Sequence, residues 1–350
     1  MKKNLLSLVA MMFATAILAQ NTLVATLSHG DRISMYYGTY ALRDALNAAS
    51  GGDVINLSGG AFQAVNITKG VTLRGSGIDS STPTYISGDF TINIPTSSTY
   101  RLTMEGIRCS NKTRLEGKYN NPYFIKCEFT DLYYGASKNS SVINNGLLVN
   151  CRILNNCEME SAGTAQFINC FVKNFQNNRY AGSNTSGAFV NCVIVLYNEG
   201  SYQAYYTHAD YINNFQLLNT ILCRVAGPYS SQLKPLPASS IATNCISVDY
   251  QYPSAAIFSN QTASTNNKTA TYTELFKNFT DTYSEGQLFE LTANAKKNFL
   301  GNDGTEVGMH GGLLPYNTTP SYPQVTKMNV ANKTTADGKL SVEIEVSAVE

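Results

Sequence analysis

The chain has no tryptophan and few charges, since Asp, Glu, Lys and Arg make up only 14% of its 350 residues. The formal net charge is +1, so the surface offers no long-range field for a polyanion, and nucleic acid is not an expected partner. A helical protein would be richer in Glu, Lys, Leu and Ala, whereas this chain has 22 tyrosines and abundant Asn, Ser and Thr. The composition therefore favours strands with hydrogen-bonding surfaces.

No apolar run is long enough to cross a bilayer. The run from Leu5 to Leu18 covers 14 residues, and a membrane-spanning helix needs about 20. Lys2 and Lys3 precede this run and Ala19 follows it, a pattern typical of a secretory signal peptide over residues 1–19. We therefore expect an exported, soluble monomer without a transmembrane segment, which is periplasmic, displayed on the cell surface or secreted.

A five-residue phrase recurs six times in the middle of the chain. Its copies begin at Ile125, Val149, Ile168, Val190, Leu218 and Thr243. The third residue is Cys in five copies and Thr220 in one, at intervals of 24, 19, 22, 28 and 25 residues. Intervals of this size fit one coil of a solenoid whose short strands pair in parallel with the next coil.

Residue types alternate with period two inside the phrase, which indicates a strand. Positions one, three and five are apolar or small, so we expect them to point inward. Position two, Asn in five copies, should point outward. Asp131, Asn155 and Asn174 each lie four residues after a cysteine, and we expect them at corners because Asn and Asp tolerate the left-handed backbone.

The phrase and its spacing resemble the pectin-lyase-like family of right-handed parallel β-helices, over roughly residues 35–315. The segment from Tyr40 to Ala49 is an amphipathic helix, similar to the family's N-terminal cap, and Gly51–Leu57 and Val71–Gly77 resemble its first coils. Residues 275–312 resemble the closing coil of secreted bacterial members. The resemblance implies an all-β, right-handed parallel β-helix, a scaffold that carries lyases, hydrolases, adhesins and inert spacers.

The chain is accordingly divided into four parts. Residues 1–19 are the signal peptide, 20–34 a lead-in, 35–315 the β-helix with its capping helix, and 316–350 a linker with a short C-terminal β extension. The extension alternates like two strands, Val325–Val330 and Lys339–Val346, around a turn. A two-stranded piece alone is marginal, so it should lie against the helix or pair with something outside this chain.

Five of the eight cysteines occupy the third position of the phrase. At that position they would form a column of buried thiols in the core, although disulfides are the usual alternative in an exported protein. A metal site is not expected, because there is no Cys-x-x-Cys pair and His29, His208 and His310 are far apart in sequence.

The resemblance implies two kinds of chemistry for an enzyme of this fold. Lyases of the family use Ca²⁺ with Arg or Lys as the base, and hydrolases use clustered aspartates. Between Phe90 and Val248 the only aspartates are Asp131 and Asp210, and there is no Gly-His-Gly. Whether the chain is an enzyme therefore stays open. No cofactor is expected, and Ca²⁺ only for a lyase.

Two surfaces could carry function. Lys126, Glu128, Asp131 and Arg152 would share one outward patch, either as a lyase site with Lys126 or Arg152 as base or as an ion pair between Glu128 and Arg152. Downstream, the fourth positions Phe171, Val193, Ile221 and Ile246 form an outward apolar stripe that something should cover. The coil between Cys192 and Thr220 and the C-terminal tail are the two candidate covers.

Aromatic and polar side chains of the long coil could also bind a sugar. These candidate ligand-binding residues are Tyr202, Tyr205, Tyr206, His208, Asp210 and Tyr211, extended by Tyr133 and Tyr134. Alternatively, the tyrosines pack as a lid over the stripe. The leading hypothesis is an exported β-helix that interacts with polysaccharide. A non-enzymatic surface or adhesin-like protein and an atypical polysaccharide lyase are the alternatives.

Overall fold

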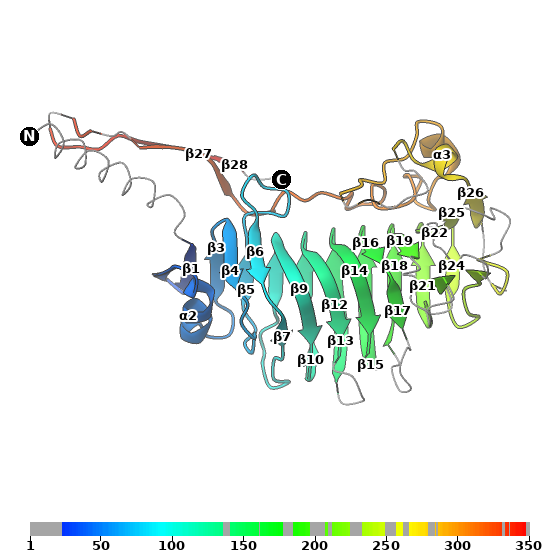
Figure 1. Ribbon diagram of the computed structural model, residues 1–350, viewed down its shortest axis with the longest axis horizontal. Coiled ribbons are helices and arrows are strands. Elements are labelled where there is room, and N and C mark those ends of the chain that lie inside the picture. Colours follow the sequence, from blue (N-terminus) through cyan, green and yellow to red (C-terminus); the bar gives the residue numbers. More distant parts are fainter. Residues whose placement is uncertain are drawn as a thin grey trace, which may run out of the picture.

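The computed structural model describes residues 23–135, 141–160, 162–177, 185–196, 207–208, 212–224, 233–248, 257–261, 266–278, 284, 286–330, 333–335 and 337–347. Two long sheets of these residues stack as a parallel β-solenoid of about 7 turns. Figure 1 shows the coils following one another along a single axis in sequence order. The predicted all-β, parallel β-helix fold is confirmed.

Sheet A contains one strand from each coil, and all its pairs are parallel except β1–β2 and β1–β3. Its order is β2 (Arg32–Tyr37), β1 (Val24–His29), β3 (Val54–Leu57), β5 (Thr72–Arg74), β8 (Thr103–Glu105), β11 (Tyr123–Ile125), β13 (Val142–Val149), β15 (Ala162–Ile168), β18 (Thr185–Val190), β21 (Phe215–Leu218) and β24 (Ile241–Thr243), with β10 (Lys118–Asn120) also paired to β13.

Sheet B contains the strand that follows in each coil. Its order is β4 (Gly60–Gln63), β6 (Thr84–Ser87), β9 (Ile107–Leu115), β12 (Glu128–Tyr134), β14 (Arg152–Met159), β16 (Phe171–Lys173), β19 (Val193–Leu196), β22 (Ile221–Arg224), β25 (Ile246–Val248) and β26 (Lys268–Ala270), with β7 (Phe90–Ile92) on β9 and β17 (Phe175–Asn177) on β14. A short parallel pair, β20 (Thr207–His208) and β23 (Leu233–Lys234), lies apart from both sheets.

Helix α2 (Ala41–Ala48) closes the N-terminal end of the solenoid. Its buried side chains Ala41, Leu42, Ala45 and Leu46 belong to the main hydrophobic core. The amphipathic pattern therefore predicted this cap correctly. Without the helix, the apolar interior of the first coil would be open to water at the end of the solenoid.

The recurring phrase is a corner between the two sheets, and the prediction that it forms one strand is wrong. Sheet A ends at position one and sheet B begins at position four, as β11 and β12 show. The residue at position two has a left-handed backbone with φ near 50°, for example 54° at Asn150. This corner interrupts the alternation, so Ile125 at position one faces outward and Phe124 before it is fully buried.

The left-handed residues explain why position two is almost always Asn, since Asn tolerates this backbone better than other side chains with a Cβ. The corners predicted four residues after the cysteines are partly wrong. Asn174 has φ 47°, but Asp131 and Asn155 lie inside β12 and β14. There the register shifts after Phe129, so the strand bends by a bulge.

The five cysteines of the phrase form a column inside the solenoid. They are free thiols and not disulfides, which agrees with the prediction of buried thiols. The Cys170 thiol donates to the carbonyls of Leu148 and Ile168 at 3.4 and 3.3 Å, and it accepts from the Cys151 amide at 3.4 Å. Thr220 makes the equivalent contacts with its hydroxyl. The column is therefore a ladder of small hydrogen-bonding side chains that satisfy the corner carbonyls.

The apolar stripe on the outside of sheet B is covered, as predicted. The cover segment lies within residues 271–300, of which 271–278, 284 and 286–300 are described; it follows β26 and contains α3 (Tyr272–Leu275) and α4 (Ala295–Asn298). Its side chains and the stripe form a second hydrophobic core that includes Phe171, Val193, Ile221, Ile246, Leu275, Phe289 and Leu291. This segment is neither of the two predicted candidates. The predicted tail contributes Tyr316, which packs against the second core. The coil after Cys192 lies partly outside the described residues.

Residues 301–322, here called the strap, then run back along the column of position-two residues. Figure 1 shows this orange stretch following the solenoid from its last coils towards its first. The strap contacts Asn219 at Asn302, Asn169 at Met309 and Gly311, and Asn150 at Pro315. The position-two asparagines that the strap contacts therefore lie outside the solenoid, as predicted, and are buried.

The last described strands, β27 (Gln324–Val330) and β28 (Val342–Ser347), form the predicted antiparallel hairpin. Figure 1 shows it beyond the N-terminal coils. Every residue of β28 is exposed, including the apolar Val342, Ile344 and Val346.

Candidate functional site

The structure brings together two of the four residues predicted as a catalytic patch. Arg152 and Glu128 form the predicted ion pair, with 2.5 Å between Nη2 and Oε2. Asp79 joins at 2.9 Å from the same Arg152 nitrogen, and Arg108 lies 3.6 Å from Glu128. Two guanidinium groups and two carboxylates thus balance one another, and the network is electrically neutral.

Lys126 and Asp131 have other partners. Lys126 is buried under the strap and donates to the carbonyl of Thr319 at 2.5 Å. Burial lowers the pKa of Lys126, although the nearby Glu105 carboxylate acts in the opposite direction. The carboxylate of Asp131 accepts from the amides of Asn155 and Asn156, both at 2.9 Å. The four side chains therefore do not converge on one open surface.

The tyrosines next to Asp131 are not a ligand platform. Tyr134 is fully buried in the main core, so its prediction as a ligand-binding residue is wrong. Tyr133 lies under the Arg114 guanidinium, 5.0 Å from the ring centre, and burial together with Glu158 and Asp131 raises its pKa to about 12. The alternation of inward and outward side chains does not hold here, because the register of β12 shifts between Phe129 and Asp131 and the residues after the bulge turn into the core.

The remaining predicted ligand-binding residues cannot be placed. Tyr202, Tyr205, Tyr206, Asp210 and Tyr211 lie outside the described residues, and for His208 only the backbone of β20 is described. Within the described ranges, no group of three or more His, Cys, Asp or Glu side chains could hold a metal ion. No helix in the described part of the chain is long and apolar enough to span a membrane.

A groove of about 700 Å³ crosses the outer face of sheet A. Its floor contains one residue from each of five successive strands, in the register Tyr123, Leu147, Gln166, Ala188 and Gln216. Its wall contains the residues two positions before those of the floor, namely Asn121, Asn145, Thr164, Ser186 and Asn214. The groove therefore runs along the solenoid axis and meets five coils.

The shape of the groove follows from its backbone and its small residues. Asn145 and Asn214 have left-handed φ of 52° and 60°, which bends the coil outward of the floor. Gly187 is required by the stacking of coils, because a Cβ there would lie 1.8 Å from the carbonyl oxygen of Ala165. On the groove side of the same strand, the lining residues Ser186 and Ala188 are small and leave the space above them open.

The groove presents amides and one aromatic ring. Asn145, Gln166, Asn214 and Gln216 are exposed, and each primary amide offers two donors and an acceptor. Tyr123 is half-buried beneath the Arg101 guanidinium, 4.8 Å from its ring centre. Burial raises its pKa against the lowering effect of Arg101. None of the described residues that line the groove is acidic, so the lining lacks the carboxylate pair that glycoside hydrolysis uses.

The groove continues at its N-terminal end into a hollow of about 100 Å³ that shares Arg101 and Asn121. Tyr100 lies at this end and is 54% exposed. Its ring rests on Gly52, where a Cβ would lie 2.7 Å from the ring. An exposed ring held flat on glycine adds a second aromatic surface to this end.

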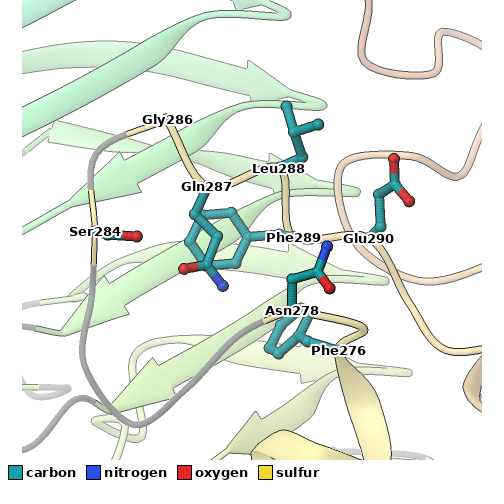
Figure 2. A pocket seen from close by; sticks show the side chains of 8 residues that line it. All are labelled: Phe276, Asn278, Ser284, Gly286, Gln287, Leu288, Phe289 and Glu290. Carbon is teal, nitrogen blue, oxygen red and sulfur yellow. The ribbon is translucent and has the colours of Figure 1, made fainter.

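Another hollow, of about 320 Å³, lies in the cover segment, and Figure 2 shows the eight residues that line it. Phe289 has the left-handed φ of 51°, which is rare for a bulky residue. Its ring stacks on Phe171 with ring centres 5.0 Å apart. The residue thus anchors the cover segment to sheet B, and the hollow is part of that packing.

Fold and groove together define a class: a parallel β-solenoid with a polar groove along its axis. Comparison with family models, curated proteins and solved structures gives no match to this chain.

Sequence reasoning missed the groove, although its floor has a simple signal. The floor residues lie three positions before position two of each phrase, as with Gln166 before Asn169 and Gln216 before Asn219. Extending the repeat two residues upstream would have shown this row.

Proposed function

We propose that this chain is an exported member of the pectin-lyase-like β-helices that binds polysaccharide in the groove of sheet A without cleaving it. The observation that carries the proposal is an open groove whose exposed amides and aromatic ring lie in line across five coils. Sugars are bound by hydrogen bonds to their hydroxyls and by apolar contact with aromatic rings. The signal-peptide pattern of residues 1–19 supports export, and an exported protein can encounter extracellular polysaccharide.

The proposal is tested with the mature chain from Gln20 in native gels that contain one polysaccharide each. We expect retardation by at least one polysaccharide, and we expect the double variant Gln166→Ala/Gln216→Ala to lose it. Gln63→Ala is the matched control, because Gln63 is an exposed amide on β4 of sheet B, outside the groove. Unretarded migration in every gel of a broad plant, microbial and host set contradicts the proposal.

A surface or adhesin-like role is the second candidate, and the hairpin favours it. The apolar side chains of Val342, Ile344 and Val346 are 48%, 53% and 57% exposed along one face of β28. Such a face is usually covered by another protein surface. If removal of residues 324–350 abolishes attachment of particles coated with this protein while gel retardation persists, adhesion is a separate activity of the hairpin.

An atypical lyase remains a hypothesis with a direct assay. Lys126 or Arg152 would have to leave its partner, Thr319 or Glu128, in order to take a proton from the substrate. Incubation with polyuronates and Ca²⁺, followed by ultraviolet absorbance of the unsaturated product, tests this. Activity lost in Arg152→Ala would revive the patch as a catalytic site.

A further inference from the structure

We infer that the groove of sheet A takes a neutral, ribbon-like polysaccharide that lies along the solenoid axis with one sugar unit on each of five coils. This inference rests on the proposed function and names the class of glycan.

The charge of the lining favours a neutral chain. Arg101 is the one charged residue among the described residues of the groove wall and floor, and it lies at the N-terminal end. An acidic polymer carries a negative charge on each unit, and each charge entering the groove would lose water without gaining a cation. Amides serve hydroxyls equally well as donors and acceptors.

The spacing of the lining favours an extended chain that repeats with the coils. Paired strands are about 4.8 Å apart, a distance close to the length of one pyranose unit in an extended glycan. Each coil contributes a polar group to the wall, from Asn121 on the first to Asn214 on the fifth. A chain lying along the axis would therefore meet an equivalent wall group at every sugar.

The floor has a second periodicity. Its amides, Gln166 and Gln216, are two coils apart, with the small Ala188 between them. A β-1,4-linked ribbon turns over at each unit, so it presents the same edge at every second sugar. The alternation of amide and small residue on the floor fits that two-unit repeat, whereas a helically coiled glycan would leave one amide without a partner.

The two ends of the row set the footprint. Arg101 and Tyr123 occupy the first coil. Beyond Gln216 the next residue in register is Ile241, which is apolar and 43% exposed. The lining of the groove itself ends with Asn214 and Gln216 on the fifth coil, so a sixth sugar would lie beyond it.

The test is titration calorimetry of the mature chain with β-1,4-linked gluco-, xylo- and manno-oligosaccharides from dimer to octamer, and with oligogalacturonides of the same lengths. We expect affinity for a neutral series to rise up to the pentamer and then to level off. Gln166→Ala and Gln216→Ala should each weaken pentamer binding by about three- to tenfold, the effect of one hydrogen bond. Gln63→Ala should leave binding unchanged.

The contrary outcomes are distinct. If oligogalacturonides bind, the neutral series does not, and Arg101→Ala abolishes the binding, the groove binds glycan but this inference is overturned. Affinity that keeps rising beyond the pentamer overturns the five-coil footprint. If neither series binds and the gels show no retardation, it is the proposed function that has failed.

Discussion

The side-chain amide of Asn169 donates to the carbonyl oxygen of Gly311 at 2.7 Å, although the two residues are 142 positions apart in the chain. The same nitrogen donates to the carbonyl of Met309 at 2.8 Å. Asn169 is thus both a corner of the solenoid, with φ 50°, and an anchor of the strap through two hydrogen bonds.

Two substitutions of Asn169 distinguish its role at the corner from its role in holding the strap. Asn169→Gly keeps the left-handed corner and removes both hydrogen bonds, so the free energy of unfolding should fall by about 1 to 3 kcal/mol. Asn169→Ala should cost about 1 to 2 kcal/mol more, because a Cβ is disfavoured in that backbone. Urea unfolding measures both. Equal stability of Asn169→Gly and the parent chain would mean that the strap contact is not stabilising.

The cover segment should depend on Phe171. Its ring stacks on Phe289 within the second hydrophobic core, and Phe171→Ala should destabilise this core by about 3 to 5 kcal/mol. Because the main core is on the other side of sheet B, limited proteolysis should cut the variant first within residues 271–300. Cleavage that begins instead in the coils of the solenoid would contradict the separation of the two cores. Phe171→Leu is the control, and it should protect the segment better than alanine.

The thiol column predicts which replacements of its cysteines are tolerated. Thr220 shows that a hydroxyl can take the place of the thiol with the same carbonyl partners. Cys170→Thr should therefore cost less than Cys170→Ala, which leaves the carbonyls of Leu148 and Ile168 without this donor. Thermal unfolding of the two variants decides the order. A lower midpoint for Cys170→Thr would show that volume outweighs hydrogen bonding in the column.

Burial of the thiols predicts instability in alkali. It raises the pKa of seven of the eight cysteines, in the case of Cys245 to about 12. The unfolded chain ionises its thiols near pH 9 and the folded chain does not, so this stabilisation is complete below about pH 9 and is lost as pH rises towards the folded values. The expected slope is about 1.4 kcal/mol per pH unit for each thiol.

Urea midpoints between pH 7 and pH 11 test this, and the midpoint should stay level to about pH 8.5 and then fall steeply. Buried tyrosines such as Tyr134, whose pKa burial also raises, add to the fall above pH 10. A variant with Cys157→Ala and Cys223→Val removes two of the thiols and should show a shallower decline. A midpoint that holds level to pH 11 would contradict the burial of these thiols.

The sequence predicts the coils because each copy of the phrase contains a buried cysteine or threonine, and burial of small apolar groups is a local property. The alternation of polar and apolar residues does not reveal the break at position two. The signal for the break is the Asn that recurs there, because Asn tolerates a left-handed backbone. Ile125 was therefore assigned to the interior, although Phe124 is the buried residue.

The strap could not be predicted from the sequence, for a different reason. Its residues bond through main-chain carbonyls, such as those of Met309 and Pro315, and every residue type has a carbonyl. The stripe that begins at Phe171 did predict that a cover exists, since exposed apolar rows are costly, but hydrophobicity cannot say which segment supplies it. The four patch residues do not cluster, because Lys126 is at the corner and contacts the strap, whereas Glu128 begins β12 and pairs with Arg152.

The strap also changes how the molecule can come apart. In a plain solenoid each coil touches only its nearest neighbours, so the last coil can fray without disturbing the first. Here a chain that leaves the final coil is fastened at Asn219, at Asn169 and again at Glu105 near the start. Loss of the terminal coils would pull on contacts made along the whole row, and stepwise fraying gives way to a single cooperative transition.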